Sequence, residues 1–274
     1  MMEGEAMWYI VAGTIVGLIA IYLFLIAPRM FNRPNRKAFY GVHYAHRGLF
    51  DNDTDAPENS LRAFQKAVEA GYGIEFDVQL SKDDVPIVFH DATLKRMCGV
   101  EGQVWEFTME ELQKMKLGNS KETIPTLRQV LQIVDGKVPL IIEYKMDRVD
   151  TKVCELGNEI LKDYEGVYCM ESFHPLAVRW YRNNRPDVVR GQLSQNYRKQ
   201  GRKQLALWIM TWLFSNVITR PDFIAYKHQH ASDLSRTLCK MMGAMSVAYT
   251  IKSEEQYETA KKHFDLFIFD SCKL

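Results

Sequence analysis

The sequence predicts an α/β protein built as a (β/α)8 TIM barrel, with a small insertion after the second strand and one N-terminal transmembrane helix in front. Short apolar runs alternate with amphipathic stretches from residue 40 onward, as repeated strand and helix units do. A barrel of this kind takes roughly 250 residues, which fits most of the 274 residues here. The runs that we interpret as barrel strands are residues 42–45, 73–78, 138–142, 167–171, 188–193, 222–225, 245–250 and 266–269.

The amphipathic stretches supply the predicted helices, at residues 60–70, 108–115, 126–134, 151–163, 175–184, 234–242 and 254–263. Another apolar run, residues 86–89, follows the second strand, and we interpret it as an extra strand inserted before the next helix. No repeat of fixed period interrupts the pattern. We therefore predict an N-terminal anchor with a basic linker, residues 1–39, and one barrel domain, residues 40–274.

Residues 8–27 contain no charged side chain, and at about 1.5 Å per residue such a helix spans the roughly 30 Å core of a bilayer. A cleaved signal peptide is the alternative. However, the stretch is long for such a peptide, no Lys or Arg precedes it, and Pro28 and Arg29 replace a small-residue cleavage site. Because acidic residues precede the helix and basic residues follow it, we expect a single-pass protein of the cell membrane with a cytoplasmic barrel. These charges are Glu3, Glu5, Arg29, Arg33, Arg36 and Lys37.

A second apolar run, residues 205–214, follows a basic stretch and is too short to cross a bilayer. It is either an outer helix packed on the barrel or a membrane-surface helix. In the second case the basic stretch contacts anionic lipid, while Trp208 and Trp212 lie among the headgroups. The sequence leaves both interpretations open, because ordinary packed helices also carry apolar stripes.

The overall charge argues against nucleic-acid binding. The 35 Lys and Arg are almost balanced by 34 Asp and Glu, whereas nucleic-acid binders usually carry a basic face. The five cysteines are widely spaced without a Cys-x-x-Cys pair, so we expect reduced thiols rather than a zinc or redox site.

Charged residues recur at the carboxyl ends of the predicted strands, which form one rim in a parallel barrel. Glu75 and Asp77 lie two residues apart on the second strand, and Glu143 follows the next barrel strand, so the three carboxylates can converge. Surface ion pairs are the alternative, but an unpaired charge in an apolar strand is costly. Because no Cys or His shares their faces, these oxygen ligands predict a site for Mg²⁺ or Ca²⁺.

Two histidines and two cationic side chains reach the same rim. His46 and His90 are placed to act as general acid and base, and the sequence does not say which takes which role. Arg47 offers a fork of donors that suits two phosphate oxygens. Lys145 supplies a point charge that can stabilise a transition state at phosphorus.

Several blocks of the sequence resemble the signature motifs of the glycerophosphodiester phosphodiesterases, in matching order and spacing. They are Ala45-His46-Arg47-Gly48, Pro57-Glu58-Asn59-Ser60, Glu75-Phe76-Asp77-Val78-Gln79, His90-Asp91 and Ile142-Glu143-Tyr144-Lys145. The resemblance implies a membrane-anchored member of the bacterial type, with His46 and His90 at the positions of the family's catalytic histidines. Glu58 and Asn59 precede the first helix, where capping is our default interpretation and contact with the active-site mouth is the alternative.

The resemblance implies metal-dependent hydrolysis of glycerophosphodiesters to glycerol 3-phosphate and an alcohol, at the inner face of the membrane. The alternative that the membrane helix favours is a lysophospholipase D, which would act on membrane lysophospholipids. A catalytically inactive, membrane-tethered scaffold fits less well, because none of the expected ligands or bases is missing.

Overall fold

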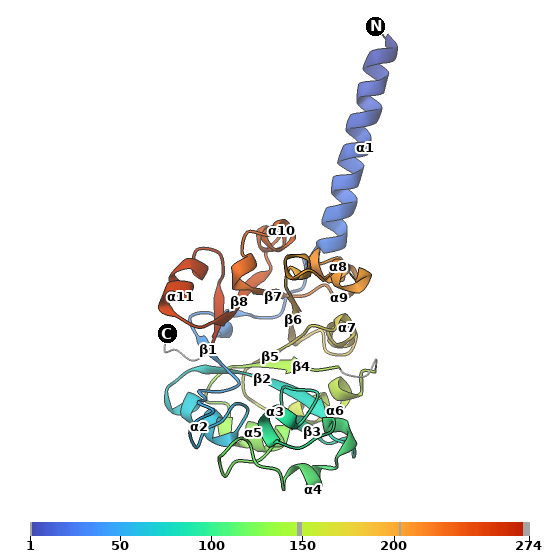
Figure 1. Ribbon diagram of the computed structural model, residues 1–274. Helices are drawn as coiled ribbons and strands as arrows, with labels where there is room; N and C mark the ends of the chain where they lie inside the picture. The colour runs from blue at the N-terminus through green and yellow to red at the C-terminus, as the bar shows by residue number, and fades with distance from the viewer. Residues whose placement is uncertain (1, 147–149, 203, 271–274) are drawn as a thin grey trace.

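The protein, described here by a computed structural model covering residues 2–146, 150–202 and 204–270, is a closed barrel of eight parallel strands, as the sequence predicts (Figure 1). Strand β1 pairs with both β9 and β2 and thereby closes the barrel. Strand β3 pairs with the outer end of β2 in antiparallel fashion, as expected of the inserted strand. The strands are β1 His43–His46, β2 Gly73–Leu80, β3 Pro86–Val88, β4 Leu140–Tyr144, β5 Tyr168–Ser172, β6 Val189–Ser194, β7 Phe223–Lys227, β8 Met245–Ile251 and β9 Leu266–Phe269.

Helices surround the barrel on its outside. They are α2 Leu61–Glu69, α5 Leu127–Val134, α6 Lys152–Leu161, α7 Pro175–Asn184, α8 Leu205–Thr211, α9 Asn216–Thr219, α10 Leu234–Met241 and α11 Glu254–Ala260. Short 3-10 helices lie at Lys37–Phe39, Val104–Glu106, Tyr197–Gln200 and His228–His230. The apolar run that begins at Leu205 therefore forms a helix of two turns, which ends at Thr211, before the chain turns into α9.

The insertion after β2 is larger than one strand, because it also contains α3 Lys95–Cys98 and α4 Met109–Leu112. The helix expected over residues 108–115 is only the single turn of α4, since Lys116 already pairs with Thr123 in an isolated bridge. The insertion has a small core of its own, which explains why it folds beside the barrel and not onto it. That core consists of Ile87, Phe89, Leu94, Met97, Val104, Met109, Leu112, Leu117 and Ile124.

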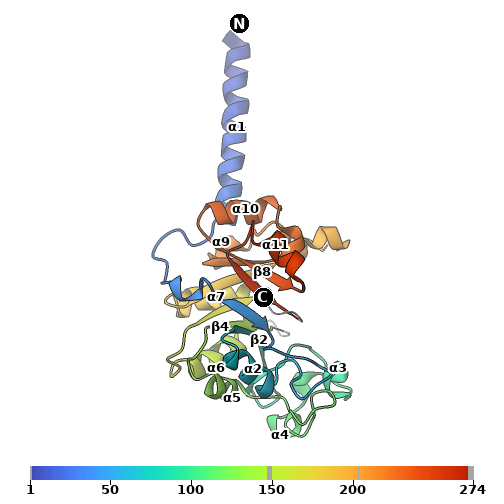
Figure 2. The ribbon, with the colours of Figure 1, turned by 90° about the vertical axis from the view of Figure 1, so that its left-hand side faces the viewer.

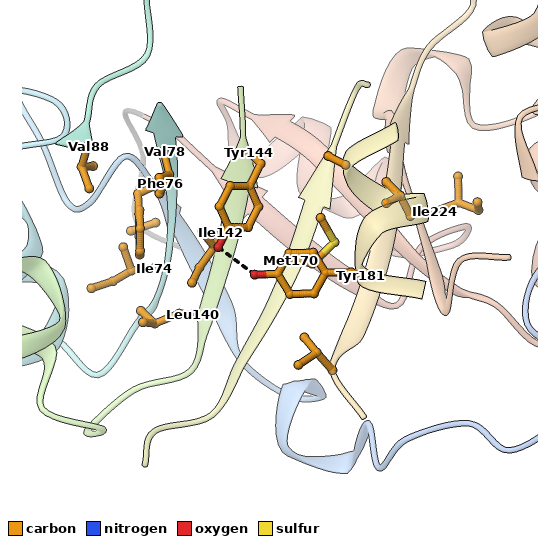
Figure 3. Close-up of a cluster of buried hydrophobic side chains, with 14 of the residues drawn as sticks. Ile74, Phe76, Val78, Val88, Leu140, Ile142, Tyr144, Met170, Tyr181 and Ile224 are labelled. Carbon is orange, nitrogen blue, oxygen red and sulfur yellow. Dashed lines mark hydrogen bonds between the residues drawn. The ribbon is translucent and has the colours of Figure 1, made fainter. Parts of the chain in front are cut away.

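Alternation along the strands separates the barrel core from the functional residues. On β2, Ile74 and Phe76 point outward into the apolar layer between sheet and helices, where Tyr144 and Tyr181 share a hydrogen bond of 2.8 Å (Figure 3). The intervening residue, Glu75, therefore points into the barrel. The inner layer is apolar below it, with buried side chains that include Tyr44, Ile141, Val189, Leu193, Phe223, Ala225, Met245, Val247, Leu266 and Ile268.

Helix α1, Met2–Ile26, rises from the layer of outer helices beside α9 and α10 (Figures 1 and 2). Within it, Ala6–Ile26 is long and apolar enough to cross a membrane, because its most apolar stretch has a mean hydropathy of 2.5. Only 6% of that stretch is buried. A membrane span and a signal sequence both fit that description.

The foot of α1 is docked on the barrel. Ile26 is fully buried, and its carbonyl accepts hydrogen bonds from the Asn216 amide at 2.7 Å and the Cys239 thiol at 3.3 Å. The Arg220 guanidinium donates to the carbonyls of Phe24 and Ala27, at 2.8 and 2.9 Å. The last turn of the helix is thus an integral contact of the domain, satisfying carbonyls that a helix end leaves unpaired.

The basic linker after α1 is held against the amino ends of the strands. Arg33 donates to the carbonyl of Met242 at 2.7 Å, and Arg36 donates to that of Gly243 at 3.0 Å. Arg29 reaches the carbonyl of Pro186 at 2.8 Å. These arginines therefore serve as hydrogen-bond donors to the barrel in addition to flanking the apolar helix.

Because Ile26 packs between α9 and α10, Ile26→Ala should lower the free energy of unfolding by about 2–4 kcal/mol, the usual cost of deleting a buried aliphatic side chain. Ile21→Ala is the matched control, since Ile21 is 58% exposed on the same helix. Thermal unfolding of both variants in detergent measures the difference. Equal and small effects would contradict the docking of the helix foot.

Candidate active site

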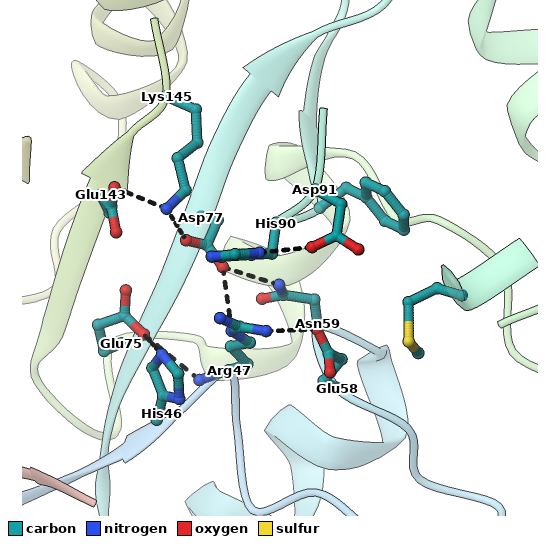
Figure 4. Close-up of polar contacts among 12 residues, drawn as sticks. His46, Arg47, Glu58, Asn59, Glu75, Asp77, His90, Asp91, Glu143 and Lys145 are labelled. Carbon is teal, nitrogen blue, oxygen red and sulfur yellow. Dashed lines mark hydrogen bonds and ion pairs between the residues drawn. The ribbon is translucent and has the colours of Figure 1, made fainter. Parts of the chain in front are cut away.

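The rim residues are brought together by strand register. His46 at the end of β1 lies opposite Glu75 on β2, and Asp77 lies opposite Glu143 on β4. Because alternate residues share a face, Glu75 and Asp77 both point into the mouth of the barrel (Figure 4).

Glu75, Asp77 and Glu143 form a buried carboxylate cluster whose oxygens lie within 4.8 Å of one another. Their exposed fractions are 2%, 0% and 7%. Burial, together with the neighbouring carboxylates, raises the pKa of Glu75 well above its usual value. Burial likewise raises the pKa of Glu143 to about 7, although Lys145 opposes the shift. Three hard oxygen ligands that repel one another fit a divalent cation, which would remove that repulsion.

Two cations partly compensate the cluster. The Lys145 ammonium lies 2.9 Å from Asp77 Oδ1 and 2.7 Å from Glu143 Oε1. The Arg47 guanidinium lies 3.6 Å from Asp77 Oδ2. Burial works against ionisation of Asp77, but Lys145, His90 and Arg47 outweigh it and hold the pKa of Asp77 below its usual range. A pocket beside the cluster is lined by Lys145, Gln79 and Trp105.

The two histidines approach the cluster from different sides (Figure 4). His46 Nε2 lies 3.8 Å from Glu75 Oε2, and burial with the nearby Arg47 charge lowers the pKa of His46 to about 3. His90 comes from the insertion, and its Nδ1 lies 2.6 Å from Asp91 Oδ1. Burial also lowers the pKa of His90. Burial thus disfavours the charged form of both rings, whereas Asp91 favours a proton on His90.

Glu58 and Asn59 contact the site, so the capping interpretation of them is wrong. Ser60 caps α2, and its hydroxyl accepts from the backbone N–H of Ala63 at 3.1 Å. The Asn59 amide instead donates to Asp77 Oδ2 at 3.0 Å, and Glu58 accepts from Arg47 at 2.6 Å. Capping needs only one residue, which frees its two predecessors to face the mouth.

Arg96 on α3 is a site residue that the sequence did not reveal. Its guanidinium donates to Asp91 at 2.6 and 3.0 Å and to Glu58 at 2.7 and 2.8 Å. Arg96 therefore ties the insertion, which carries His90, to the loop that positions Arg47. Only the fold places α3 beside that loop, so no spacing in the sequence could indicate the contact.

Arg96→Ala should lower kcat about tenfold while leaving cation affinity little changed, because Arg96 supports His90 through Asp91 but does not belong to the carboxylate cluster that would hold the cation. Burial opposes ionisation of Asp91, but Arg96 holds its pKa below the usual value. The variant should therefore shift the acidic limb of the pH–rate profile to higher pH. Arg62→Ala, at a half-exposed arginine paired with Asp55, is the control. A variant with unchanged kcat and pH profile would contradict this positioning role.

Comparisons with known proteins agree with this geometry. Residues 46–264 match the Glycerophosphoryl diester phosphodiesterase family. A glycerophosphodiester phosphodiesterase of Caldanaerobacter subterraneus is 35% identical over 164 residues, which is 55% of this chain and 65% of the relative. One from Bacillus altitudinis is 37% identical over 159 residues, 53% of this chain and 63% of the relative. The aligned segments thus span slightly less than two thirds of these relatives.

A solved structure has the same fold. A phosphodiesterase of Oleispira antarctica, solved in complex with its product sn-glycerol-3-phosphate, superposes with a TM-score of 0.71 at 22% identity, covering 84% of this chain and 93% of the other. The family match includes the carboxylate cluster, both histidines and both phosphate-binding candidates. The chain therefore belongs to the glycerophosphoryl diester phosphodiesterase family, a family of hydrolases.

Proposed function

We propose that this protein is a metal-dependent glycerophosphodiester phosphodiesterase, which releases glycerol 3-phosphate and an alcohol. The observation that carries the proposal is the buried cluster of Glu75, Asp77 and Glu143 at the mouth of the barrel. Two histidines and two cations border it, which is the set of groups that phosphodiester hydrolysis requires. Family membership supports the same activity.

The cluster would hold Mg²⁺ or Ca²⁺, and the ion would supply charge neutralisation at the phosphodiester oxygens. Arg47 and Lys145 would bind the remaining phosphate oxygens, since both cations already lie at the mouth and can exchange a carboxylate partner for a phosphate.

His46 would act as the base, because its low pKa keeps the ring unprotonated and because the ring is less exposed than that of His90 and lies beside Glu75. It takes the proton of the attacking hydroxyl. As the bond from phosphorus to the alcohol oxygen breaks, His90 donates a proton to that oxygen. The Asp91 carboxylate at Nδ1 supports the protonated state that this role needs.

We also propose that α1 is retained as a membrane anchor with the barrel on the cytoplasmic side. Docking of its foot supports retention, since removal of α1 would break the hydrogen bond from the Asn216 amide to the Ile26 carbonyl and would take the fully buried Ile26 side chain out of the domain. The basic residues after the helix support the orientation. Attachment to a bilayer favours lysophospholipase D activity as the second candidate, because lysophospholipids would reach the enzyme within the membrane surface.

The test incubates the full chain in nanodiscs with either glycerophosphocholine or lysophosphatidylcholine, and identifies the phosphate-bearing product. Glycerol 3-phosphate from the first substrate would support the proposal. Lysophosphatidic acid from the second substrate alone would favour the lysophospholipase D. Neither product under Mg²⁺ or Ca²⁺ would contradict both and favour an inactive scaffold.

A further inference from the structure

Exposed apolar side chains on the barrel are concentrated on two helices. Among the described residues after Tyr40, five large hydrophobic side chains are exposed, and four of them lie on α8 and α10. These four define the α8/α10 patch and are Leu205 at 72%, Trp208 at 41%, Leu234 at 58% and Met241 at 77% exposure. Spacings of three residues on α8 and seven on α10 put each pair on one face of its helix. Isolated apolar residues need no explanation, but a concentration of them does.

The α8/α10 patch lies beside the foot of α1. The ring of Tyr22 on α1 packs edge-on against that of Phe214, with 5.9 Å between the ring centroids. The Phe214 ring in turn packs against that of Trp208, with 5.2 Å between the centroids. On the other side, Cys239 of α10 donates to the Ile26 carbonyl. Figures 1 and 2 show α8, α9 and α10 at the end from which α1 rises, and α4 at the opposite end.

The length of α1 sets the depth of these contacts. The apolar span Ala6–Ile26 is about 30 Å long, which equals the thickness of the hydrocarbon core of a bilayer. Tyr22 lies within that span, so its aromatic neighbours Phe214 and Trp208 must lie at the level where the hydrocarbon meets the headgroups. Tryptophan is enriched at this level in membrane proteins.

The charge of the surrounding segment complements an anionic membrane. Residues 197–242 contain eight Lys and Arg but only two Asp and no Glu, whereas the rest of the chain carries a net negative charge. Of the two, Asp233 is paired with Lys199 at 2.9 Å, and Asp222 is fully buried. Arg198 and Arg202 are exposed just before α8. Each such cation near an anionic surface contributes about 1 kcal/mol to attachment.

We propose that the α8/α10 patch rests in the headgroup layer of an anionic bilayer and holds the barrel side-on to the membrane. This inference rests on the membrane anchor proposed above. Tyr197–Gln200 and Leu205 follow the carboxyl end of β6, and Leu234 follows that of β7, so this part of the patch lies on the same side of the barrel as its mouth. This orientation would bring the side of the mouth at β6 and β7 close to the bilayer, from which a lysophospholipid would reach the site.

The direct test places spin labels on the full chain in nanodiscs of phosphatidylcholine and phosphatidylglycerol, one copy per disc. Labels at Leu205→Cys and Leu234→Cys should collide with oxygen more readily than with a water-soluble nickel complex. A label at Glu110→Cys on α4, whose side chain is 83% exposed at the far end, should show the reverse. The unsubstituted protein, labelled in parallel, gives the background of the native cysteines. Aqueous behaviour at all three positions would overturn the proposal.

A second measurement separates this inference from the proposed function. The double variant Leu205→Asp with Leu234→Asp should hydrolyse glycerophosphocholine within about twofold of the parent but lysophosphatidylcholine in the discs at least about tenfold more slowly. Glu110→Asp on α4 is the control. If the double variant changes the rate on both substrates by the same factor, the inference is contradicted. Inactivity of the parent on both substrates would contradict the proposed function and leave the label result standing. Label protection that appears only with several copies per disc would assign the patch to contact between copies and overturn the proposal.

Discussion

Glu75→Gln is expected to abolish hydrolysis and at the same time to stabilise the cation-free protein. The substitution removes one ligand of the proposed cation, and the loss of several kcal/mol of transition-state stabilisation corresponds to a fall in kcat of about 10³-fold. Folding should respond in the opposite direction, because the folded state raises the pKa of Glu75 and therefore disfavours its charge. A gain of about 0.5–2 kcal/mol is typical when such a functional strain is removed.

The sign of the pH dependence follows from that pKa. Below the raised folded-state pKa, Glu75 is protonated in the folded protein and costs little, whereas above it the buried charge must be accommodated. The stabilisation by Glu75→Gln should therefore be larger at pH 8 than at pH 5, as measured by thermal unfolding in EDTA. Glu171→Gln is the matched control for activity, since Glu171 is 1% exposed on β5, beyond β4, and lies outside the ligand cluster. It should keep activity within about tenfold. Full activity of Glu75→Gln would contradict the assigned site.

His46→Asn and His90→Asn are expected to lower kcat by about 10²–10⁴-fold each, the contribution of a general acid or base. Cation binding should persist in both variants, because neither ring belongs to the carboxylate cluster. Calorimetric titration with Mg²⁺ or Ca²⁺ checks that point. Loss of cation binding together with activity would instead indicate that the histidines are ligands or structural supports.

The two roles can be separated with the leaving group. p-Nitrophenolate leaves without protonation. A diester of p-nitrophenol should therefore restore most of the rate to the variant that lacks the acid and none to the variant that lacks the base. We expect recovery for His90→Asn, whose ring is partnered by Asp91, and none for His46→Asn. The opposite pattern would exchange the roles.

The barrel could be predicted from sequence because buried parallel strands are continuous apolar runs, and those runs are separated by amphipathic helices. Convergence of Glu75, Asp77 and Glu143 could also be predicted, since strand ends share one rim and alternate residues share one face. The structure brings these carboxylates together with the predicted His46 and His90. Their chemical roles stay predictions.

Features that depend on contacts between distant segments could not be predicted. Arg96 reaches the site only because the insertion folds around its own core, and nothing local distinguishes it from a surface arginine. The docking of Ile26 against Asn216 joins residues 190 positions apart, which no periodicity reveals. The local sequence also gave a wrong prediction at Glu58. Its position before a helix indicated a capping residue, but Ser60 caps that helix.

Release of glycerol 3-phosphate from glycerophosphocholine by the full chain, before and after removal of divalent cations, tests the central claim most directly. We predict that EDTA abolishes the release and that Mg²⁺ or Ca²⁺ restores it in the parent protein but not in Glu75→Gln. Undiminished release after complete removal of cations would contradict the assignment of Glu75, Asp77 and Glu143 as a catalytic cation site.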